Sequence, residues 1–296
     1  MKPAALEWSM KADSSVTLAR REAILSGLHA QRGVPKIMGI INVTTDSFYE
    51  GSRALQPEDA VQRAIEMWQD GATWIDIGGE STRPGAEPVD EATEASRVVP
   101  VIKALREIKP MGLISIDTRH AFVATAALNA GANMINDISG LRDPEMVRVV
   151  LEHGCAVCIM HMQGEPGTMQ QEPHYTDCVS EVSQYLEQQR QMLVQWGHDN
   201  SLICLDPGIG FGKTHEHNLE LLRTGRGILQ ESTQSLLWGA SRKRLIGHLT
   251  KQEDTENRLS GTLGVAAVAF EQGIDLLRVH DVRAHADLFA TMEAVR

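Results

Sequence analysis

The sequence has few cysteines, no long apolar run and a deficit of positive charge. Its 296 residues include four cysteines without the spacing of a disulfide framework, which excludes a disulfide scaffold and fits a reducing compartment. The longest apolar stretch, Gly264–Phe270, is far shorter than the roughly 20 residues that span a bilayer. The 28 Lys and Arg against 39 Asp and Glu give a net charge of −11, which disfavours nucleic acid and anionic membranes as partners.

The composition is that of an ordinary globular protein. With 42% hydrophobic residues, 23% charged residues and 25 glycines, the chain has enough apolar side chains for a sizeable core. Its length fits either one (β/α)₈ barrel or two average domains. The first 34 residues lack the charged start, apolar run and cleavage site of a secretory signal, so we expect a cytoplasmic protein.

From Lys36 onward, short runs rich in Ile and Val alternate eight times with stretches of helical periodicity. The expected strands are Lys36–Ile41, Thr73–Ile77, Leu113–Ile116, Asn133–Asn136, Ala156–Met160, Leu202–Leu205, Leu236–Ala240 and Leu276–Val279. The expected helices are Pro57–Asp70, Glu91–Glu107, Ala121–Ala130, Pro144–His153, Cys178–Trp196, His217–Leu229, Thr255–Glu271 and Ala284–Ala294. Eight such units predict an α/β fold, either a closed (β/α)₈ TIM barrel or an open doubly wound sheet.

The polar residues favour the barrel, because one follows nearly every expected strand and only a closed barrel brings all these ends to one mouth. They are Asn42, Asp76, Asp117, Asn136, Asp137, His161, Asp206, Ser241, Lys243 and His280. We therefore predict a single barrel domain over residues 35–296 and an N-terminal extension over residues 1–34. Within the extension, Val16–Ala30 could form an amphipathic helix or a plug of the barrel. The long loops Gly78–Asp90 and Gln163–Thr176 are expected to cover a substrate.

The charges at the mouth suggest a ligand. Asp117, Asn136 and Asp206 suit a heterocycle with several N–H donors on one edge, although Asp117 could instead cap the helix that follows it. The opposite side of the mouth is expected to be cationic and to bind phosphate, although each cation alone could be a surface ion pair. These cations are Arg83, Lys243, Arg278 and His280.

Three motifs that imitate other kinds of site are discounted. The segment Pro207–Thr214 imitates a phosphate loop but has proline where that loop needs glycine. The set His153, Cys155, Cys158 and His161 has the residue types of a metal site, but the two cysteines should face opposite sides of a buried strand. The serine in Gly78–Thr82 has no His-Asp pair nearby in sequence to activate it.

Eight motifs, in their order along the chain, resemble those of dihydropteroate synthase. They are NVTTDSF from Asn42, DIGGESTRPG from Asp76, IDT from Ile116, INDI from Ile135, MHMQG from Met160, LDPGIGFGK from Leu205, SRK from Ser241 and RVHDV from Arg278. The resemblance implies a TIM-barrel transferase that joins 6-hydroxymethyl-7,8-dihydropterin diphosphate to p-aminobenzoate in folate biosynthesis. It also implies Mg²⁺, sensitivity to sulfonamides as a drug class, a dissociative mechanism and usually a homodimer.

The resemblance further implies a role for individual residues. The pterin is expected to lie against Asp117, Asn136, Met160, Asp206, Gly239 and Lys243. The diphosphate is expected to contact Asn42, Arg83, Arg278 and His280, with Asn42 as the Mg²⁺ ligand. The p-aminobenzoate site is expected to include Thr82, Arg83, Pro84, Phe211, Lys243 and Arg244. The catalytic roles fall to Asp117, Lys243, Arg278 and His280.

The chain departs from the family pattern at two positions. Thr45 stands where the family usually has proline, which should loosen the first loop. Arg244 replaces the serine that usually follows Ser-Arg-Lys, and it either pairs with the carboxylate of p-aminobenzoate or turns outward. Two alternatives remain open: a barrel resembling a methyltetrahydrofolate:corrinoid methyltransferase, and a non-catalytic pterin-binding paralogue.

Overall fold

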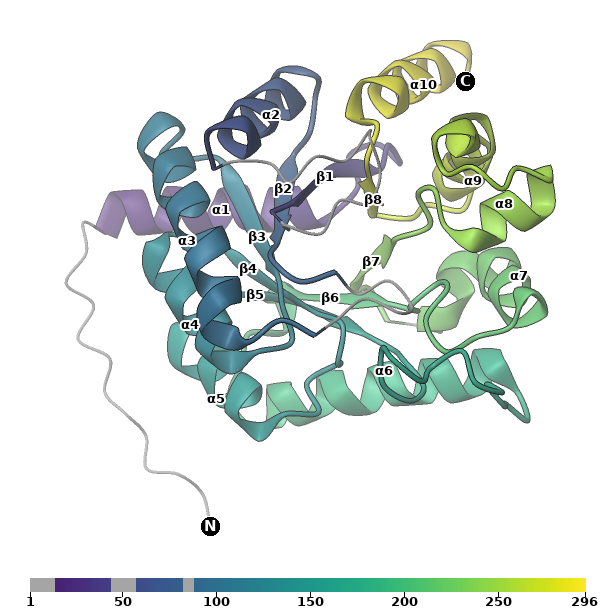
Figure 1. The fold of residues 1–296 in the computed structure, drawn as a ribbon, viewed down its shortest axis with the longest axis horizontal. Coiled ribbons are helices and arrows are strands. Elements are labelled where there is room, and N and C mark those ends of the chain that lie inside the picture. The colour runs from purple at the N-terminus through teal and green to yellow at the C-terminus, as the bar shows by residue number, and fades with distance from the viewer. Residues whose placement is uncertain (1–13, 44–56, 82–87, 231) are drawn as a thin grey trace.

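The computed structural model describes residues 14–43, 57–81, 88–230 and 232–296. Within these residues, eight parallel strands pair in chain order and close into a barrel, with β8 paired to β1 (Figure 1). The strands are β1 Lys36–Asn42, β2 Trp74–Gly78, β3 Leu113–Asp117, β4 Met134–Asp137, β5 Ala156–Met160, β6 Ile203–Asp206, β7 Ser235–Trp238 and β8 Leu276–Val279. The predicted TIM barrel is confirmed, and the open doubly wound sheet is wrong.

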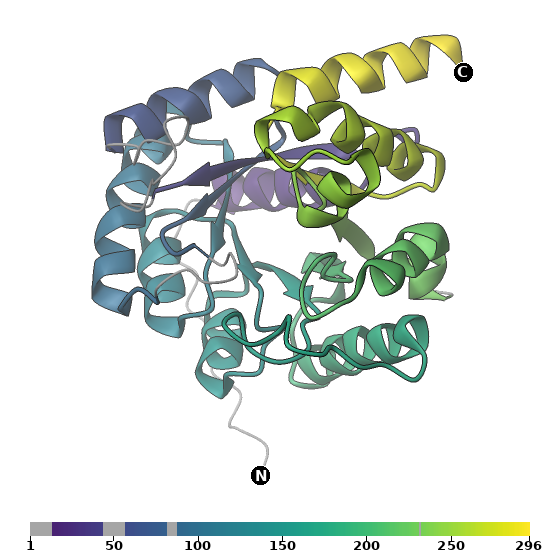
Figure 2. The same cartoon turned by 45° about the vertical axis from the view of Figure 1, so that its right-hand side comes forward.

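Helices surround the strands, as the turned view also shows (Figure 2). They are α1 Ser14–Leu28, α2 Pro57–Gln69, α3 Glu91–Ile108, α4 Ala121–Ala130, α5 Pro144–His153, α6 Cys178–Gln195, α7 His215–Thr224, α8 Arg244–Thr250, α9 Leu259–Glu271 and α10 Val282–Val295. Short 3₁₀ turns are η1 Asn200–Leu202, η2 Gly225–Leu229 and η3 Glu256–Arg258. No helix in the described part of the chain is long and apolar enough to cross a membrane.

The strands are apolar throughout because both of their faces are buried. Along β5, Val157 and Ile159 belong to the large core between strands and helices, whereas Ala156 and Cys158 belong to the cluster inside the barrel. This alternation follows from the two-residue repeat of a strand. Cys155, just before β5, packs in the outer core, so the cysteines face opposite sides as predicted.

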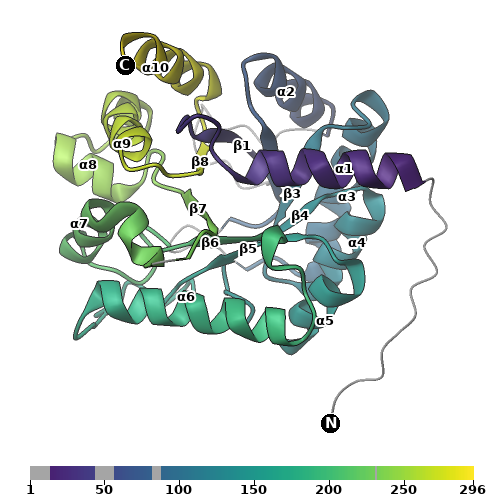
Figure 3. The ribbon, with the colours of Figure 1, turned by 180° about the vertical axis from the view of Figure 1, so that it is seen from behind.

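Helix α1 lies across the amino-terminal end of the barrel (Figure 3). Leu28 is fully buried and packs in the same cluster as Met38 and Trp74 of the barrel interior. The indole Nε1 of Trp74 donates to the carbonyl of Gly27 at 2.8 Å, and the Ser235 hydroxyl donates to the carbonyl of Leu28. These contacts fix α1 as a plug, which is one of the two roles expected for this segment.

Two differences from the predicted elements occur after β6. The expected helix His217–Leu229 is interrupted, because Gly225 adopts φ 54° and ψ −131° and only a 3₁₀ turn follows it. Helix α8 was not predicted, because its seven residues include a glycine and show too little periodicity. That glycine, Gly247, is required by packing, since a Cβ there would lie 2.6 Å from the carbonyl oxygen of Gln252.

Candidate active site

The carboxyl ends of the strands carry a group of polar and charged side chains. The strand register places Asp117 beside Asn136, and Asp206 beside Met160. Asn42 ends β1 and is exposed. The side chains of Asn136 and Asp206 are nearly inaccessible, at 4% and 5% exposure. The mouth of the barrel therefore brings together residues that are distant in sequence, as predicted.

Arg278 of β8 reaches two carboxylates, Asp76 of β2 and Asp117 of β3. Its Nε donates to Asp76 Oδ2 at 2.5 Å, and its Nη2 donates to Asp117 Oδ2 at 2.5 Å. Asp76 also accepts from the Asn136 amide at 3.2 Å. The expected separation into an anionic and a cationic side is thus wrong for Arg278. Buried ions are costly unless paired, and closure of the barrel lets this guanidinium pair with both acids.

The charges and the burial of this cluster keep the Arg278 guanidinium charged and make the Asp117 carboxyl harder to ionise. Burial raises the pKa of Asp117 to about 7, with Asp76 adding to the rise and Arg278 opposing it. Burial alone would lower the pKa of Arg278, but Asp76 and Asp117 raise it above its usual value. Asp117 does not cap the following helix, whose N-cap residue is His120. Its carboxylate instead pairs with Arg278 at the mouth of the barrel.

Gly239 lies close to three of the predicted site residues. A Cβ built on Gly239 would lie 3.8 Å from Lys243 Nζ, 3.9 Å from Asp206 Oδ2 and 4.0 Å from the Cβ of Arg278. Side chains from three neighbouring strands and loops therefore converge on one point that a glycine leaves open. Burial raises the pKa of Asp206, although Lys243 and the backbone N–H of Gly208 oppose the rise. That N–H donates to Asp206 Oδ1 at 2.7 Å.

Lys243 is held between the end of β7 and the glycine-rich loop after β6. Its Nζ donates to the carbonyl of Ile209 and lies 4.3 Å from the centre of the Phe211 ring. Burial lowers the pKa of Lys243 to about 8, although Asp206 opposes this shift. Phe211 itself packs against an apolar cluster that includes Met160. Lys243 thus stands between an aromatic face, an acid and Arg278.

His280 and Ser241 form the remaining polar pair of the mouth. The Ser241 hydroxyl lies 3.0 Å from His280 Nδ1, and it accepts from the His280 backbone N–H at 3.3 Å. This pair joins the loops after β7 and β8, where barrels of this kind often bind phosphate. Arg244 is exposed at the first position of α8. The predicted positions Thr82, Arg83, Pro84 and Thr45 lie outside the described residues.

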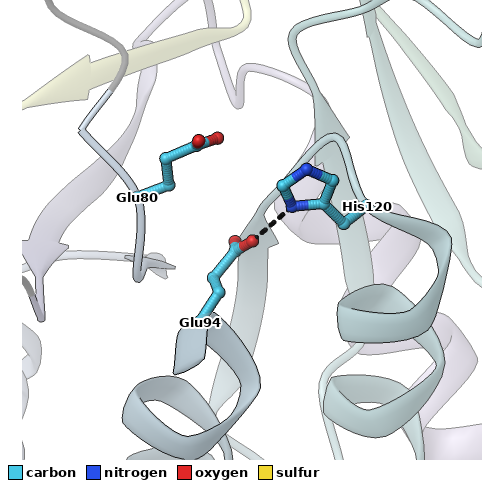
Figure 4. Close-up of side chains that lie close together, drawn as sticks. All are labelled: Glu80, Glu94 and His120. Atoms are coloured by element: carbon cyan, nitrogen blue, oxygen red, sulfur yellow. Dashed lines mark hydrogen bonds and ion pairs between the residues drawn. The ribbon is translucent and has the colours of Figure 1, made fainter. Parts of the chain in front are cut away.

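A second cluster of ligand-type side chains lies where β2 and β3 lead into α3 and α4. Atoms of Glu80, Glu94 and His120 lie within 4.8 Å of one another (Figure 4). However, Arg119 donates hydrogen bonds to both carboxylate oxygens of Glu80 at 3.0 and 3.1 Å, and His120 Nδ1 lies 2.7 Å from Glu94 Oε2. The hydrogen bond to Glu94 raises the pKa of His120. Two basic groups thus pair with two carboxylates, although Glu94 Oε1 is buried without a hydrogen-bond partner, and the cluster forms an ion-pair network.

Sequence reasoning left two residues out of the site. Asp76 was noted as a polar strand end, but its contact with Arg278 depends on the closed barrel and not on local sequence. Lys213 is the last residue of the motif LDPGIGFGK, but its burial has no local signal, since a lysine before a helix is usually exposed. In the structure its side chain is buried at 3% exposure.

Comparison with known proteins agrees with this geometry. A family model described as pterin binding enzyme matches residues 38–280. Dihydropteroate synthase of Escherichia coli K12 is 42% identical over 260 residues, which cover 88% of this chain and 91% of that protein. The chain belongs to the dihydropteroate synthase family of pterin-binding enzymes. The resemblance that the motifs indicated is therefore confirmed.

Solved structures of the family extend the match to three dimensions. The Yersinia pestis dihydropteroate synthase in a sulfonamide drug complex superimposes with a TM-score of 0.85 at 40% identity, covering 91% of this chain and 97% of that one. The Xanthomonas albilineans dihydropteroate synthase in complex with 7,8-dihydropteroate gives a TM-score of 0.80 at 37% identity, covering 92% of this chain and 97% of that one.

Proposed function

We propose that this protein is a dihydropteroate synthase that condenses 6-hydroxymethyl-7,8-dihydropterin diphosphate with p-aminobenzoate and releases diphosphate. The observation that carries the proposal is the convergence of Asp206, Lys243 and Arg278 around Gly239, in a chain of this family. The Asp206 carboxylate and the Asn136 amide oxygen can accept hydrogen bonds from the N–H edge of a pterin, and the neighbouring cations can bind its diphosphate. The mouth of the barrel thus offers the complementary charges that the substrate needs.

The reaction breaks the bond between the pterin methylene carbon and the diphosphate oxygen. The electron pair leaves with diphosphate, and the arylamine nitrogen of p-aminobenzoate then forms the new bond and loses a proton. In this proposal Arg278 and His280 stabilise the charge that develops on the departing oxygens. Asp206 and Asn136 orient the pterin ring, and Asp117, which ionises as the pH rises through its raised pKa of about 7, stabilises the positive charge that the pterin acquires. No covalent enzyme intermediate is needed.

Mg²⁺ fits this site as an ion bound mainly through the substrate. Mg²⁺ usually keeps several waters and takes one or two protein oxygens together with substrate phosphates. Asn42 supports this assignment, because it ends β1 at the mouth with an exposed amide. Asp76 and Asp117 are engaged by Arg278. When bound, the ion would neutralise charge on the leaving diphosphate.

The family resemblance also supports a cytoplasmic homodimer. The four cysteines, all in the described residues, are free and buried, as suits a reducing compartment. The exposed apolar side chains Leu249 of α8 and Val268 of α9, at 48% and 40% exposure, offer surface for a second copy. Sedimentation of the purified chain at micromolar concentration should give twice the monomer mass; a monomer would contradict the dimer alone and leave the activity untouched.

Two alternatives are separated from the synthase by a binding and release experiment together with a parallel assay of methyl transfer. Pterin diphosphate and Mg²⁺ are mixed with the protein, with and without p-aminobenzoate, and both bound pterin and free diphosphate are measured. The synthase predicts pterin binding and diphosphate release that p-aminobenzoate accelerates. Tight binding with no release would favour the non-catalytic paralogue. Methyl transfer from methyltetrahydrofolate to a corrinoid, with no diphosphate release, would favour the methyltransferase.

A further inference from the structure

The loop between β6 and α7 has an unusual backbone that side chains must hold in place. Gly208, Gly210 and Gly212 have φ values of 69°, 85° and 57°, so alternate residues adopt the left-handed conformation. A Cβ on Gly208 would lie 1.9 Å from the carbonyl oxygen of His161, so this close approach of two backbones requires glycine. A loop of this kind has no regular hydrogen-bond ladder to define its shape.

Side-chain donors replace that ladder. The carbonyl oxygens of five successive residues, 208 to 212, each accept a hydrogen bond from a side chain. Gln170 binds the carbonyl of Gly210 at 2.8 Å, and Tyr175 binds that of Gly212 at 2.8 Å. Lys213 supplies two of the five, and Lys243 supplies the one at Ile209.

Lys213 is the most connected of these donors. Its Nζ lies 3.0 Å from the carbonyl oxygens of both Gly208 and Phe211, and 3.2 Å from that of His161. It also lies 3.0 Å from His161 Nδ1. An ammonium group offers three protons to these four partners, and burial lowers the pKa of Lys213 to about 7. One buried amino group thus ties two points of the glycine-rich loop to the residue that follows β5.

The two points, Gly208 and Phe211, lie next to or within the contacts that hold Lys243 in place. The Lys243 ammonium is held by the carbonyl of Ile209, which follows Gly208, and by the face of the Phe211 ring. Gly208 in addition donates its N–H to Asp206. A shift of the loop would therefore displace, at the same time, the groups that hold Lys243 and the N–H that binds Asp206.

We propose that Lys213 is a positioning residue of the active site, whose buried ammonium fixes the loop 207–212 and thereby the place of Lys243 and Phe211. The described partners of its Nζ are all groups of the protein itself. The inference rests on the proposed function, because its effect is read as turnover of p-aminobenzoate.

The test compares Lys213→Met, which keeps the length but removes the donors, with Lys103→Met, an exposed lysine of α3 that serves as the control. We expect kcat/KM for p-aminobenzoate to fall roughly 10- to 100-fold in Lys213→Met, measured below its unfolding temperature, since a charged donor to several carbonyls is lost. The control should match the wild type. Unchanged kinetic constants in a folded Lys213→Met protein would overturn the proposal.

A double-mutant cycle separates positioning from general stability. If Lys213 acts through the loop, Phe211→Leu will cost much less in the Lys213→Met background than in the wild type, because the ring is already misplaced. Fold-losses that simply multiply would refute the proposal.

If Lys213→Met does not fold, the milder Lys213→Gln and Tyr175→Phe variants provide the same comparison. Tyr175→Phe releases only the Gly212 carbonyl, so a smaller loss in the same direction is expected, and none in either variant would overturn the proposal. Failure of the wild type to form product would instead refute the proposed function. In that case the affinity of each variant for a pterin is measured instead, because the loop also holds Asp206 through the N–H of Gly208. An affinity equal to that of the wild type would overturn the inference.

Discussion

Replacing Asp117 by asparagine should stabilise the protein above neutral pH while it removes activity. Burial raises the pKa of this carboxyl from its usual 3.8 to about 7. The folded state then binds the proton more tightly than the unfolded state, so the wild type loses stability as the pH rises from about 4 to 7. A rise of this size corresponds to about 4 kcal/mol at pH values above 7.

Asparagine resembles the protonated carboxyl in shape and cannot ionise, so the variant avoids this loss. Its carbonyl oxygen can still accept from Arg278. We expect the free energy of unfolding of Asp117→Asn to equal that of the wild type near pH 4 and to exceed it by about 2 to 4 kcal/mol at pH 8. The assay is urea unfolding without substrates, at pH values from 4 to 8.

Asp90, at the start of α3, provides a control in which the same substitution should lower the free energy of unfolding. Asp90 accepts hydrogen bonds from Thr93, and these lower the pKa of Asp90. Asp90→Asn should therefore lose stability above about pH 4, where the wild-type carboxylate is ionised. If Asp117→Asn is equally or less stable than the wild type at pH 8, or if its gain persists unchanged at pH 4, the electrostatic reasoning is refuted.

Three further changes test the site. Asp76→Asn removes one of two carboxylates that hold Arg278, so kcat/KM for pterin diphosphate should fall roughly 10- to 100-fold, and an unchanged value in steady-state kinetics would contradict this. Gly239→Val should abolish pterin binding by calorimetry while the protein stays folded, because the new side chain enters the open centre of the site; normal binding would count against the placement. Arg244→Ser should change the affinity for p-aminobenzoate or for sulfonamides, and equal affinities would dispose of that idea.

The barrel could be predicted from sequence because its signals are local and repeated. Strands buried on both faces read as short apolar runs, as in Ala156–Met160, and helices such as Pro144–His153 carry a proline at the start and a glycine at the end. The predicted bounds of these two elements are those of the structure. Helix α8 was missed because seven residues give too short a pattern to detect.

The site was only partly predictable for a different reason. Strand ends identify which residues reach the mouth, so Asp117, Asn136 and Asp206 were found. Which of them touch depends on the closure of the barrel, and the pairing of Arg278 with Asp76 joins residues 202 positions apart. The role of Lys213 depends on the path of a left-handed glycine loop, which has no periodicity to read.

The central claim is that this chain joins a pterin to p-aminobenzoate. The most direct measurement is the formation of 7,8-dihydropteroate by the purified protein with pterin diphosphate, p-aminobenzoate and Mg²⁺, quantified beside released diphosphate. The account predicts product that requires both substrates, one diphosphate for each dihydropteroate, and no product from Gly239→Val. Diphosphate release without dihydropteroate, or no reaction at all by folded protein that binds the pterin, would contradict it.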